Sequence, residues 1–322
     1  MQAIIEVNNL TKRYKRGTTN AVDGISFNVV QGELFALLGP NGAGKTTTIS
    51  ILTTTLAPTS GKAVIAGYDV STQARAVRRQ VGIIFQNPSL DLNLTAEENV
   101  RFHAVLYGLY PFRPTFAAMP ATYRDEVMSL AKVLSLQDDM FKPIKRFSGG
   151  MKRKLEIIRS LIHKPKVLFL DEPTIGLDPA SRRSLWEYLA QVRAERQTTV
   201  LLTTHYLEEA EQADTICVIN KGKIVAYGTP SQLTSQLASD SFLYVDSDNR
   251  AQLRRELQGL GYNFEDQGPF KIRLNGHNIQ QVIKAVDTPL NYVKTQIPTL
   301  EDAYLAIVDA QDEEKIVEIE HE

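Results

Sequence analysis

Short apolar runs alternate with longer segments of helical periodicity over the first two thirds of the chain. Residues 3–10 and 25–30 alternate apolar and polar positions, and they are predicted to form strands around a turn that holds Gly17 and Asn20. Residues 166–171 and 198–205 contain the apolar runs "VLFL" and "VLL" and are predicted to form strands in a parallel sheet covered on both faces. Further strands are predicted at 33–39, 63–67 and 81–86, with a hairpin over 216–228.

Helical spacing prevails from about residue 95 to 143. Segments 96–109 and 123–136 place apolar residues three and four positions apart. Between them, residues 110–123 contain three prolines and are predicted to form a loop. A helix is also expected over 45–56 despite its β-branched threonines, because the preceding glycine-rich loop sets its start.

The pattern changes after about residue 240. Strand, helix, two strands, helix, strand and helix follow in that order up to residue 308. This order is similar to a ferredoxin-like βαββαβ unit with an added helix. We therefore predict a domain over 1–230, a linker over 231–240, a small α+β domain over 241–310 and an acidic tail over 311–322.

The composition limits the number of domains, the kinds of partner and the cell compartment that we expect for this chain. Its 322 residues suggest two domains, and a formal net charge of −1 gives no positive field that would favour nucleic acid. The single cysteine, Cys217, lies in an apolar run and is predicted to be a buried, inert thiol. No signal-peptide core and no apolar run of about 20 residues is present, so we expect a cytosolic chain whose partner supplies any membrane spans.

The stretch "GPNGAGKT" at 39–46 fits the phosphate-loop pattern at every position, and it follows a predicted strand and opens a predicted helix. Backbone N–H groups of such a loop surround phosphates, Lys45 reaches the β- and γ-phosphates, and the Thr46 hydroxyl can bind Mg²⁺. The sequence therefore predicts an ATP site that includes Gly39, Pro40, Asn41, Gly42, Ala43, Gly44, Lys45, Thr46 and Thr47.

Acidic and polar residues follow the predicted strands around this loop. Asp171 ends a buried strand and is predicted to hold Mg²⁺, while Glu172 is predicted to be the base for an attacking water. Gln86 is predicted to contact the metal or that water, and His205 to bond the γ-phosphate. Tyr14 precedes the loop and could stack on adenine, although packing in the core is the alternative for this side chain.

A second glycine pair occurs at "FSGGM", residues 147–151. Ser148 can donate its hydroxyl, and Gly149 and Gly150 can expose N–H groups at a helix N-terminus. An ordinary glycine-rich helix cap is the alternative. One ATPase chain has no evident use for two phosphate-binding loops of its own.

These motifs, together with "VLFLDEP" and "GLDP", resemble an ABC-transporter ATP-binding subunit in order and spacing over about residues 3–230. The resemblance implies a P-loop NTPase cassette with a RecA-like core, an antiparallel β subdomain and a helical subdomain at about 88–160. It also implies a head-to-tail dimer with a second copy of the chain or with a paralogous ATPase, in which Ser148 of one subunit caps the ATP of the other, with Asp178 at the same seam. A separate membrane permease would be the further partner, which places the chain on the inner face of the cell membrane.

The sequence departs from the commonest signature wording at two positions. Phe147 and Met151 stand where leucine and glutamine are usual, and the loop 110–123 is longer than usual. The segment "IPTLEDAYLAIV" is similar to the closing helix of exporter ATPases of the daunorubicin-resistance type. A non-transport ABC ATPase and a regulatory ATP-binding module are the alternatives, and the transported substrate is left open.

Overall fold

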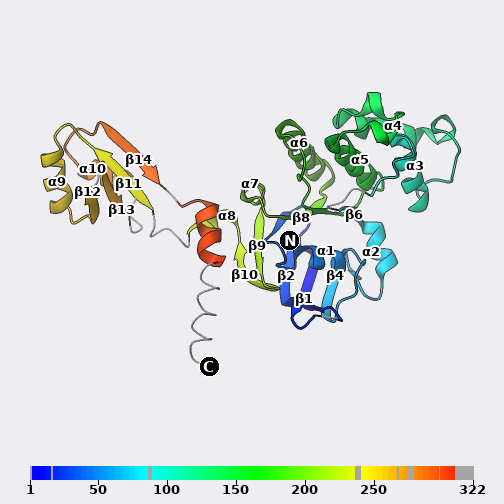
Figure 1. Ribbon diagram of the computed structural model, residues 1–322, viewed down its shortest axis with the longest axis horizontal. Coiled ribbons are helices and arrows are strands. Elements are labelled where there is room, and N and C mark those ends of the chain that lie inside the picture. The colour runs from blue at the N-terminus through cyan, green and yellow to red at the C-terminus, as the bar shows by residue number, and fades with distance from the viewer. Residues whose placement is uncertain are drawn as a thin grey trace. The chain divides into compact units, whose positions relative to one another are not determined.

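The computed structural model describes residues 2–15, 17–85, 89–235, 241–266, 268–274, 279–296 and 298–308. The chain divides into two compact units, Met1–Tyr227 and Gly228–Glu322. Figure 1 shows both units.

A six-stranded sheet forms the centre of the first unit, in the order β10-β9-β3-β8-β7-β6. The neighbouring pairs β9–β3, β3–β8, β8–β7 and β7–β6 are parallel. Strands β3 and β7 carry almost only apolar side chains, and β8 is buried along its whole length although it also carries three threonines, which fits a sheet covered on both faces. The strands are β3 (Leu34–Leu38), β6 (Val81–Ile84), β7 (Val167–Asp171), β8 (Thr199–Thr204), β9 (Thr215–Asn220) and β10 (Lys223–Gly228).

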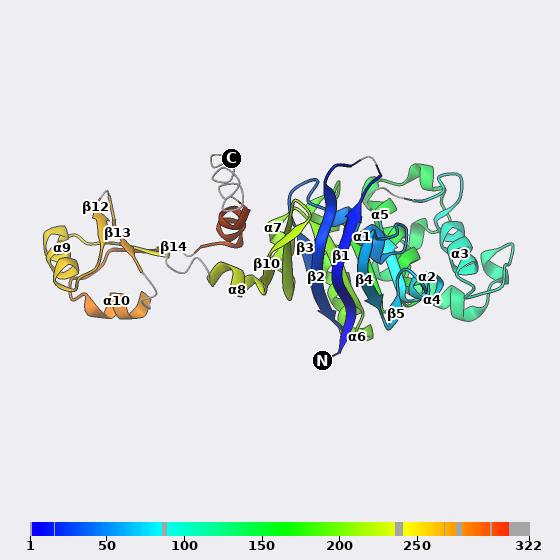
Figure 2. The same ribbon diagram turned by 90° about the horizontal axis from the view of Figure 1, so that it is seen from below.

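A second, antiparallel sheet has the order β2-β1-β4-β5. Helix α1 (Lys45–Leu52) contacts β2 of this sheet and β7 of the other, and a shared hydrophobic core includes Val7, Phe35 and Ile49. Figure 2 shows this sheet along one side of the unit. Its strands are β1 (Ala3–Arg13), β2 (Asn20–Val30), β4 (Ser60–Ile65) and β5 (Tyr68–Asp69).

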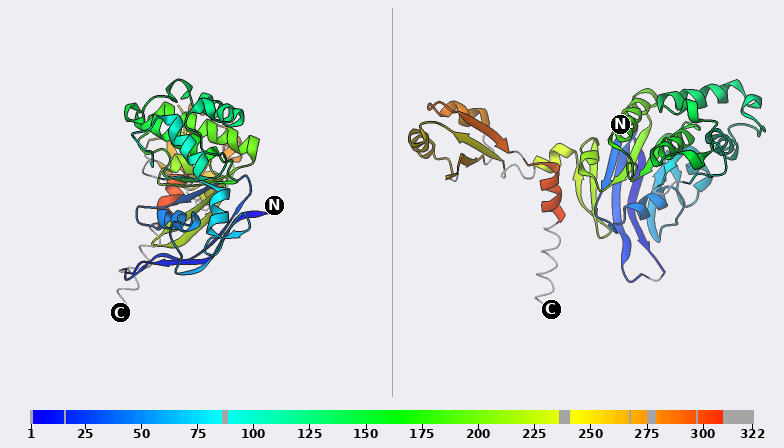
Figure 3. Two further views of the ribbon diagram at one scale, coloured as in Figure 1. Left: turned by 90° about the vertical axis from the view of Figure 1, so that its right-hand side faces the viewer. Right: turned by 45° about the horizontal axis from the view of Figure 1, so that its top comes forward.

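Helices α3 (Ala96–Leu106), α4 (Ala121–Val133) and α5 (Gly149–Leu161) form a lobe beside the sheets, drawn in cyan to green in Figure 3. Thr95 and Glu98 form a capping box that fixes the start of α3. The remaining helical elements of this unit are α2 (Ala74–Gln80), η1 (Phe116–Ala118), η2 (Gln137–Asp139), η3 (Ile144–Arg146), α6 (Pro179–Arg196) and α7 (Leu207–Ala210).

The second unit contains an antiparallel sheet in the order β12-β13-β11-β14. This order is the one expected for a ferredoxin-like βαββαβ unit, and α9 and α10 contribute Leu253, Leu257 and Val282 to its core. The elements are α8 (Pro230–Ser235), β11 (Phe242–Asp246), α9 (Arg250–Gly259), β12 (Phe264–Asp266), β13 (Phe270–Arg273), α10 (Ile279–Ala285), β14 (Tyr292–Gln296) and a helix over 300–308.

The structure differs from the sequence predictions at several boundaries. The helix expected over 45–56 ends at Leu52, because the hydroxyls of Thr53 and Thr55 donate to the carbonyls of Ile49 and Ser50 and compete with further helical bonds. The helix that follows His205, α7, comprises only four residues.

Other expectations bear on the less regular parts of the chain. The predicted loop 110–123 contains η1 and the first turn of α4. Residues 231–235 of the expected linker belong to helix α8, whereas the rest of that linker and the predicted acidic tail lie outside the described residues. Cys217 is buried, as predicted, and burial raises the pKa of its thiol. Within the described ranges, no helix has both the length and the apolar content that crossing a bilayer requires.

Candidate functional site

The glycine-rich loop joins the end of β3 to the start of α1. A methyl group on Gly39 would lie 2.1 Å from the carbonyl oxygen of Ile219, and one on Gly44 would lie 2.4 Å from that of Ala21. Gly44 also has a φ of +111°, which side chains disfavour. The close approach of the neighbouring backbone therefore excludes larger residues at both positions. Residues 41–47 line a cavity of about 180 Å³.

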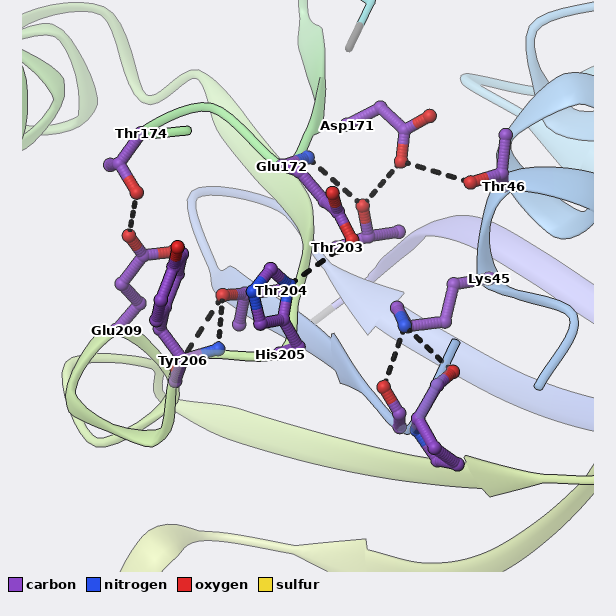
Figure 4. A network of polar contacts seen from close by, with 12 residues as sticks. Lys45, Thr46, Asp171, Glu172, Thr174, Thr203, Thr204, His205, Tyr206 and Glu209 are labelled. Atoms are coloured by element: carbon purple, nitrogen blue, oxygen red, sulfur yellow. Dashed lines mark hydrogen bonds and ion pairs between the residues drawn. The ribbon is translucent and has the colours of Figure 1, made fainter. Parts of the chain in front are cut away.

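Lys45 lies in the floor of this loop and is only 5% exposed. Its Nζ donates to the carbonyl oxygens of Gly39 at 2.6 Å and Pro40 at 3.0 Å (Figure 4). Burial lowers the pKa of this ammonium group, while the nearby carboxylates of Glu172 and Asp171 act in the opposite direction. A cation held by loop carbonyls is well placed to exchange them for the oxygens of an anionic ligand.

Asp171 is the last residue of β7, and Thr203 on β8 is its partner in the parallel ladder. The Thr203 hydroxyl donates to Asp171 Oδ1 at 2.5 Å, and Thr46 Oγ1 lies 3.4 Å from the same oxygen. Burial raises the pKa of the Asp171 carboxyl, and the bond from Thr203 opposes the increase. A hydroxyl and a carboxylate that converge beside the phosphate loop form the oxygen donor set that Mg²⁺ prefers.

Glu172 follows β7 with a φ of +49°, in the left-handed region that is costly for a residue with a side chain. Its amide donates to the carbonyl and the hydroxyl of Thr203, each at 3.1 Å. Its Oε1 lies 3.3 Å from Nδ1 of His205, the residue that directly follows β8. Two residues further on, the Thr174 hydroxyl donates to the buried carboxylate of Glu209 on α7 (Figure 4).

Ser148 and Gly149 are exposed at the start of the 13-residue helix α5. The Ser148 hydroxyl accepts a bond from the amide of Met151 at 3.2 Å, so it is the N-cap of this helix. A methyl group on Gly150 would lie 3.2 Å from the hydroxyl of Ser181, which faces Gly150 from α6. Ser148 is therefore a helix N-cap, and both it and Gly149 are accessible from outside the subunit.

Asp178 occupies the equivalent position at the start of α6. Its carboxylate accepts from the amide of Ser181 at 2.9 Å and from the hydroxyl of the same residue at 2.6 Å. These bonds lower the pKa of Asp178. Within the part of the chain that the structure describes, the loop cavity is lined by Ala21, residues 41–47 and Glu172. Ser148 and Asp178 do not contribute to that lining.

Comparison with known proteins fits this geometry. A family model described as ABC transporter matches residues 22–175. Nod factor export ATP-binding protein I of Ralstonia nicotianae is 39% identical over 266 residues, which cover 82% of this chain and 79% of that protein. Daunorubicin/doxorubicin resistance ATP-binding protein DrrA of Streptomyces peucetius is 41% identical over 256 residues, or 79% and 74% of the two chains.

The chain belongs to the ABC transporter family.

Solved cassettes agree with the assignment. The ATP-binding subunit of an ABC transporter is 32% identical with a TM-score of 0.64, over 73% of this chain and 93% of that one. The dimeric cassette MJ0796, solved with ADP and inorganic phosphate, is 25% identical with a TM-score of 0.63, over 70% and 98% of the two chains. This chain is thus an ATP-binding, ATP-hydrolysing subunit of an ABC exporter with the P-loop cassette fold.

Tyr14 and Gln86 are two further residues that the sequence predicts at this site. Tyr14 is 47% exposed, so the core-packing alternative is wrong, and its hydroxyl lies 3.2 Å from Thr47 Oγ1 beside the loop. Gln86 lies outside the described residues, directly after Phe85.

Sequence reasoning missed Thr203, which contacts both Asp171 and Glu172. It also missed the buried Arg153 and Glu209. The paired threonines at the end of β8 are a signal for the first of these, since parallel neighbours end at the same edge of the sheet.

Proposed function

We propose that this ABC ATPase binds ATP with Mg²⁺ in the loop 39–46 and hydrolyses it with Glu172 as the general base. The observation that carries this proposal is the convergence of Lys45, Asp171 and Glu172 at one edge of the parallel sheet. Glu172 would accept the proton of the attacking water, and His205 would hold that carboxylate and contact the γ-phosphate.

Thr46 and Asp171 are the residues that would hold the metal, with Gln86 as a third candidate. The pairing of a hydroxyl with a carboxylate of raised pKa fits this role, because a bound cation would favour the ionised form of Asp171. When bound, Mg²⁺ neutralises the charge that develops on the phosphate oxygens. Tyr14, beside Thr47, would stack on the adenine ring.

The functional unit would be a head-to-tail dimer. Ser148, Gly149 and Gly150 do not line the chain's own nucleotide cavity, yet they present donors at an exposed helix N-terminus. In the proposed dimer these donors cap the γ-phosphate held by the partner copy, with Asp178 at the same seam. ATP then joins the two copies and its hydrolysis releases them. The dimeric state of the similar cassette MJ0796 supports this arrangement.

The dimer would power export through a separate membrane permease, which would keep the chain at the inner face of the membrane. The lobe of α3, α4 and α5 would transmit closure to that permease. The relatives named for Nod factor export and for daunorubicin/doxorubicin resistance support a role in export, with the permease selecting the transported substrate. A non-transport ABC ATPase is not favoured by these relatives.

The test is the variant Glu172→Gln, assayed for phosphate release and for assembly by analytical ultracentrifugation with ATP and Mg²⁺. We expect turnover to fall at least about 100-fold and an ATP-bound dimer to accumulate. Glu187→Gln, an exposed change on α6, is the control and should behave as the wild type. Undiminished phosphate release from Glu172→Gln would refute the base assignment.

A further inference from the structure

Arg153 is a buried cation that the site described above does not use. It lies on α5, five positions after the N-cap Ser148, and it is 6% exposed. A guanidinium group carries five N–H donors in a rigid fork. Each of these donors finds an acceptor here, namely the carbonyl oxygens of Phe85, Asp171, Glu172 and Pro173 and the carboxylate of Glu156.

Three of the acceptors belong to the segment that carries the proposed base. Nη2 donates to the carbonyls of Asp171 and Glu172, both at 3.3 Å, and Nε donates to that of Pro173 at 2.9 Å. This is the segment in which Glu172 adopts its left-handed φ of +49°. A strained backbone conformation persists only where surrounding contacts stabilise it. The hydrogen bonds from Arg153 to the carbonyl oxygens of this segment are contacts of that kind.

The other contacts of Arg153 tie this segment to its surroundings. Nη1 donates to Phe85, which directly follows β6, and to Glu156 Oε2 at 3.2 Å. Glu156 is 1% exposed, and its other oxygen accepts a bond from the amide of Ser89 at 2.9 Å. Arg153 thereby connects helix α5 to the ends of two neighbouring strands, β6 and β7. The charge of this buried cation is balanced within the same helix turn by Glu156.

We propose that Arg153 is a positioning residue for ATP hydrolysis, which holds the backbone of Glu172 in the orientation that directs its carboxylate toward His205. Since the same helix begins at Ser148, its position and that of Glu172 are mechanically linked within one subunit. A nucleotide capped by Ser148 would thus bias the base of the opposite site. This inference rests on the proposed role of Glu172.

A double-mutant cycle in the full-length chain tests the proposal, using single-turnover ATP hydrolysis with excess protein. Arg153→Met should slow hydrolysis about 10- to 100-fold, the range expected when a reacting group is misplaced by about 1 Å. Binding of a fluorescent ATP analogue should change by less than about twofold, because Arg153 does not line the loop cavity. Lys154→Met, the next residue of α5, is the matched control and should keep the wild-type rate.

The decisive comparison is made in the Glu172→Gln background. There, Arg153→Met should slow the residual reaction by less than about twofold, since the carboxylate that Arg153 positions is already absent. Equal losses in both backgrounds would mean general structural damage and would overturn the proposal. Normal turnover of Arg153→Met would overturn it while leaving the base assignment intact, whereas normal turnover of Glu172→Gln would contradict both ideas.

A second variant guards against failure to fold, because Arg153→Met leaves the buried Glu156 with only its longer ion pair, to Arg159 at 3.8 Å. Arg153→Met with Glu156→Gln removes both charges and keeps an acceptor for the amide of Ser89. This pair should show native circular dichroism and the same loss of hydrolysis as Arg153→Met. Recovery of the wild-type rate in the pair would overturn the proposal, because the loss would then come from the buried Glu156 after removal of its nearer cation.

Discussion

The hydroxyl of Thr203 donates to Asp171 Oδ1 at 2.5 Å, and the two residues are direct partners between β7 and β8. The same hydroxyl oxygen accepts the amide proton of Glu172. One small side chain thus orients a buried carboxylate and anchors the residue that follows it. Partners of this kind tune the ligands of a metal without touching it.

We predict that Thr203→Val lowers the apparent affinity for Mg²⁺ in ATP hydrolysis. The valine has the same shape but cannot hold Asp171 Oδ1, so the carboxylate loses the bond that orients it and favours its charged form. The Mg²⁺ concentration for half-maximal ATP hydrolysis should rise about tenfold. Thr198→Val, another buried threonine just before β8, is the control. An unchanged Mg²⁺ dependence in Thr203→Val would contradict the role given to this hydroxyl.

Asp171→Asn should stabilise the protein in the absence of nucleotide and metal while abolishing turnover. The carboxyl is buried beside Glu172, and burial raises its pKa above the ordinary 3.8. Asparagine keeps an oxygen that can accept from Thr203 but carries no charge. We expect a gain of about 1 kcal/mol in the free energy of unfolding at neutral pH, measured by denaturant titration.

The pH dependence of that gain follows from the sign of the shift. Because the folded carboxyl binds its proton more tightly than the unfolded one, the wild type loses stability as pH rises from 3.8 through the raised folded pKa. The asparagine variant has no such loss, so the difference should be near zero in acid, grow over this interval and then level off. A difference that shrinks as pH rises would contradict the assignment.

Ser148→Asp should separate the role of Ser148 as the N-cap of α5 from its proposed role in capping the ATP of the partner copy. Aspartate is as good an N-cap as serine, so the helix bond from the amide of Met151 is retained and the melting temperature of the free chain should be unchanged. The added charge would face the triphosphate of the partner copy. In the Glu172→Gln background, the ATP-dependent dimer should therefore be lost in size-exclusion chromatography. Ser148→Asn, a neutral cap, is the matched control and should keep a measurable dimer. A normal dimer in Ser148→Asp would contradict the proposed capping.

Local patterns in the sequence were sufficient for much of the architecture. The strands predicted at 166–171 and 198–205 correspond to β7 and β8, because a strand buried on both faces carries a continuous apolar run such as those in these segments. The order of strands and helices after residue 240 was likewise sufficient for the ferredoxin-like sheet order of the second unit. The glycine loop could be located since its backbone path depends on residues that are adjacent in the chain.

Contacts between distant segments were decided only by the tertiary structure. Thr203 and Asp171 are 32 positions apart, and their meeting depends on the register of two parallel strands. Arg153 looks like any basic residue of an amphipathic helix, yet folding buries it against carbonyl groups of two other segments. The sequence by itself determined which chemical groups are present and which local elements carry them. Register and side-chain packing, which sum many weak non-local contacts, decided which of those groups touch.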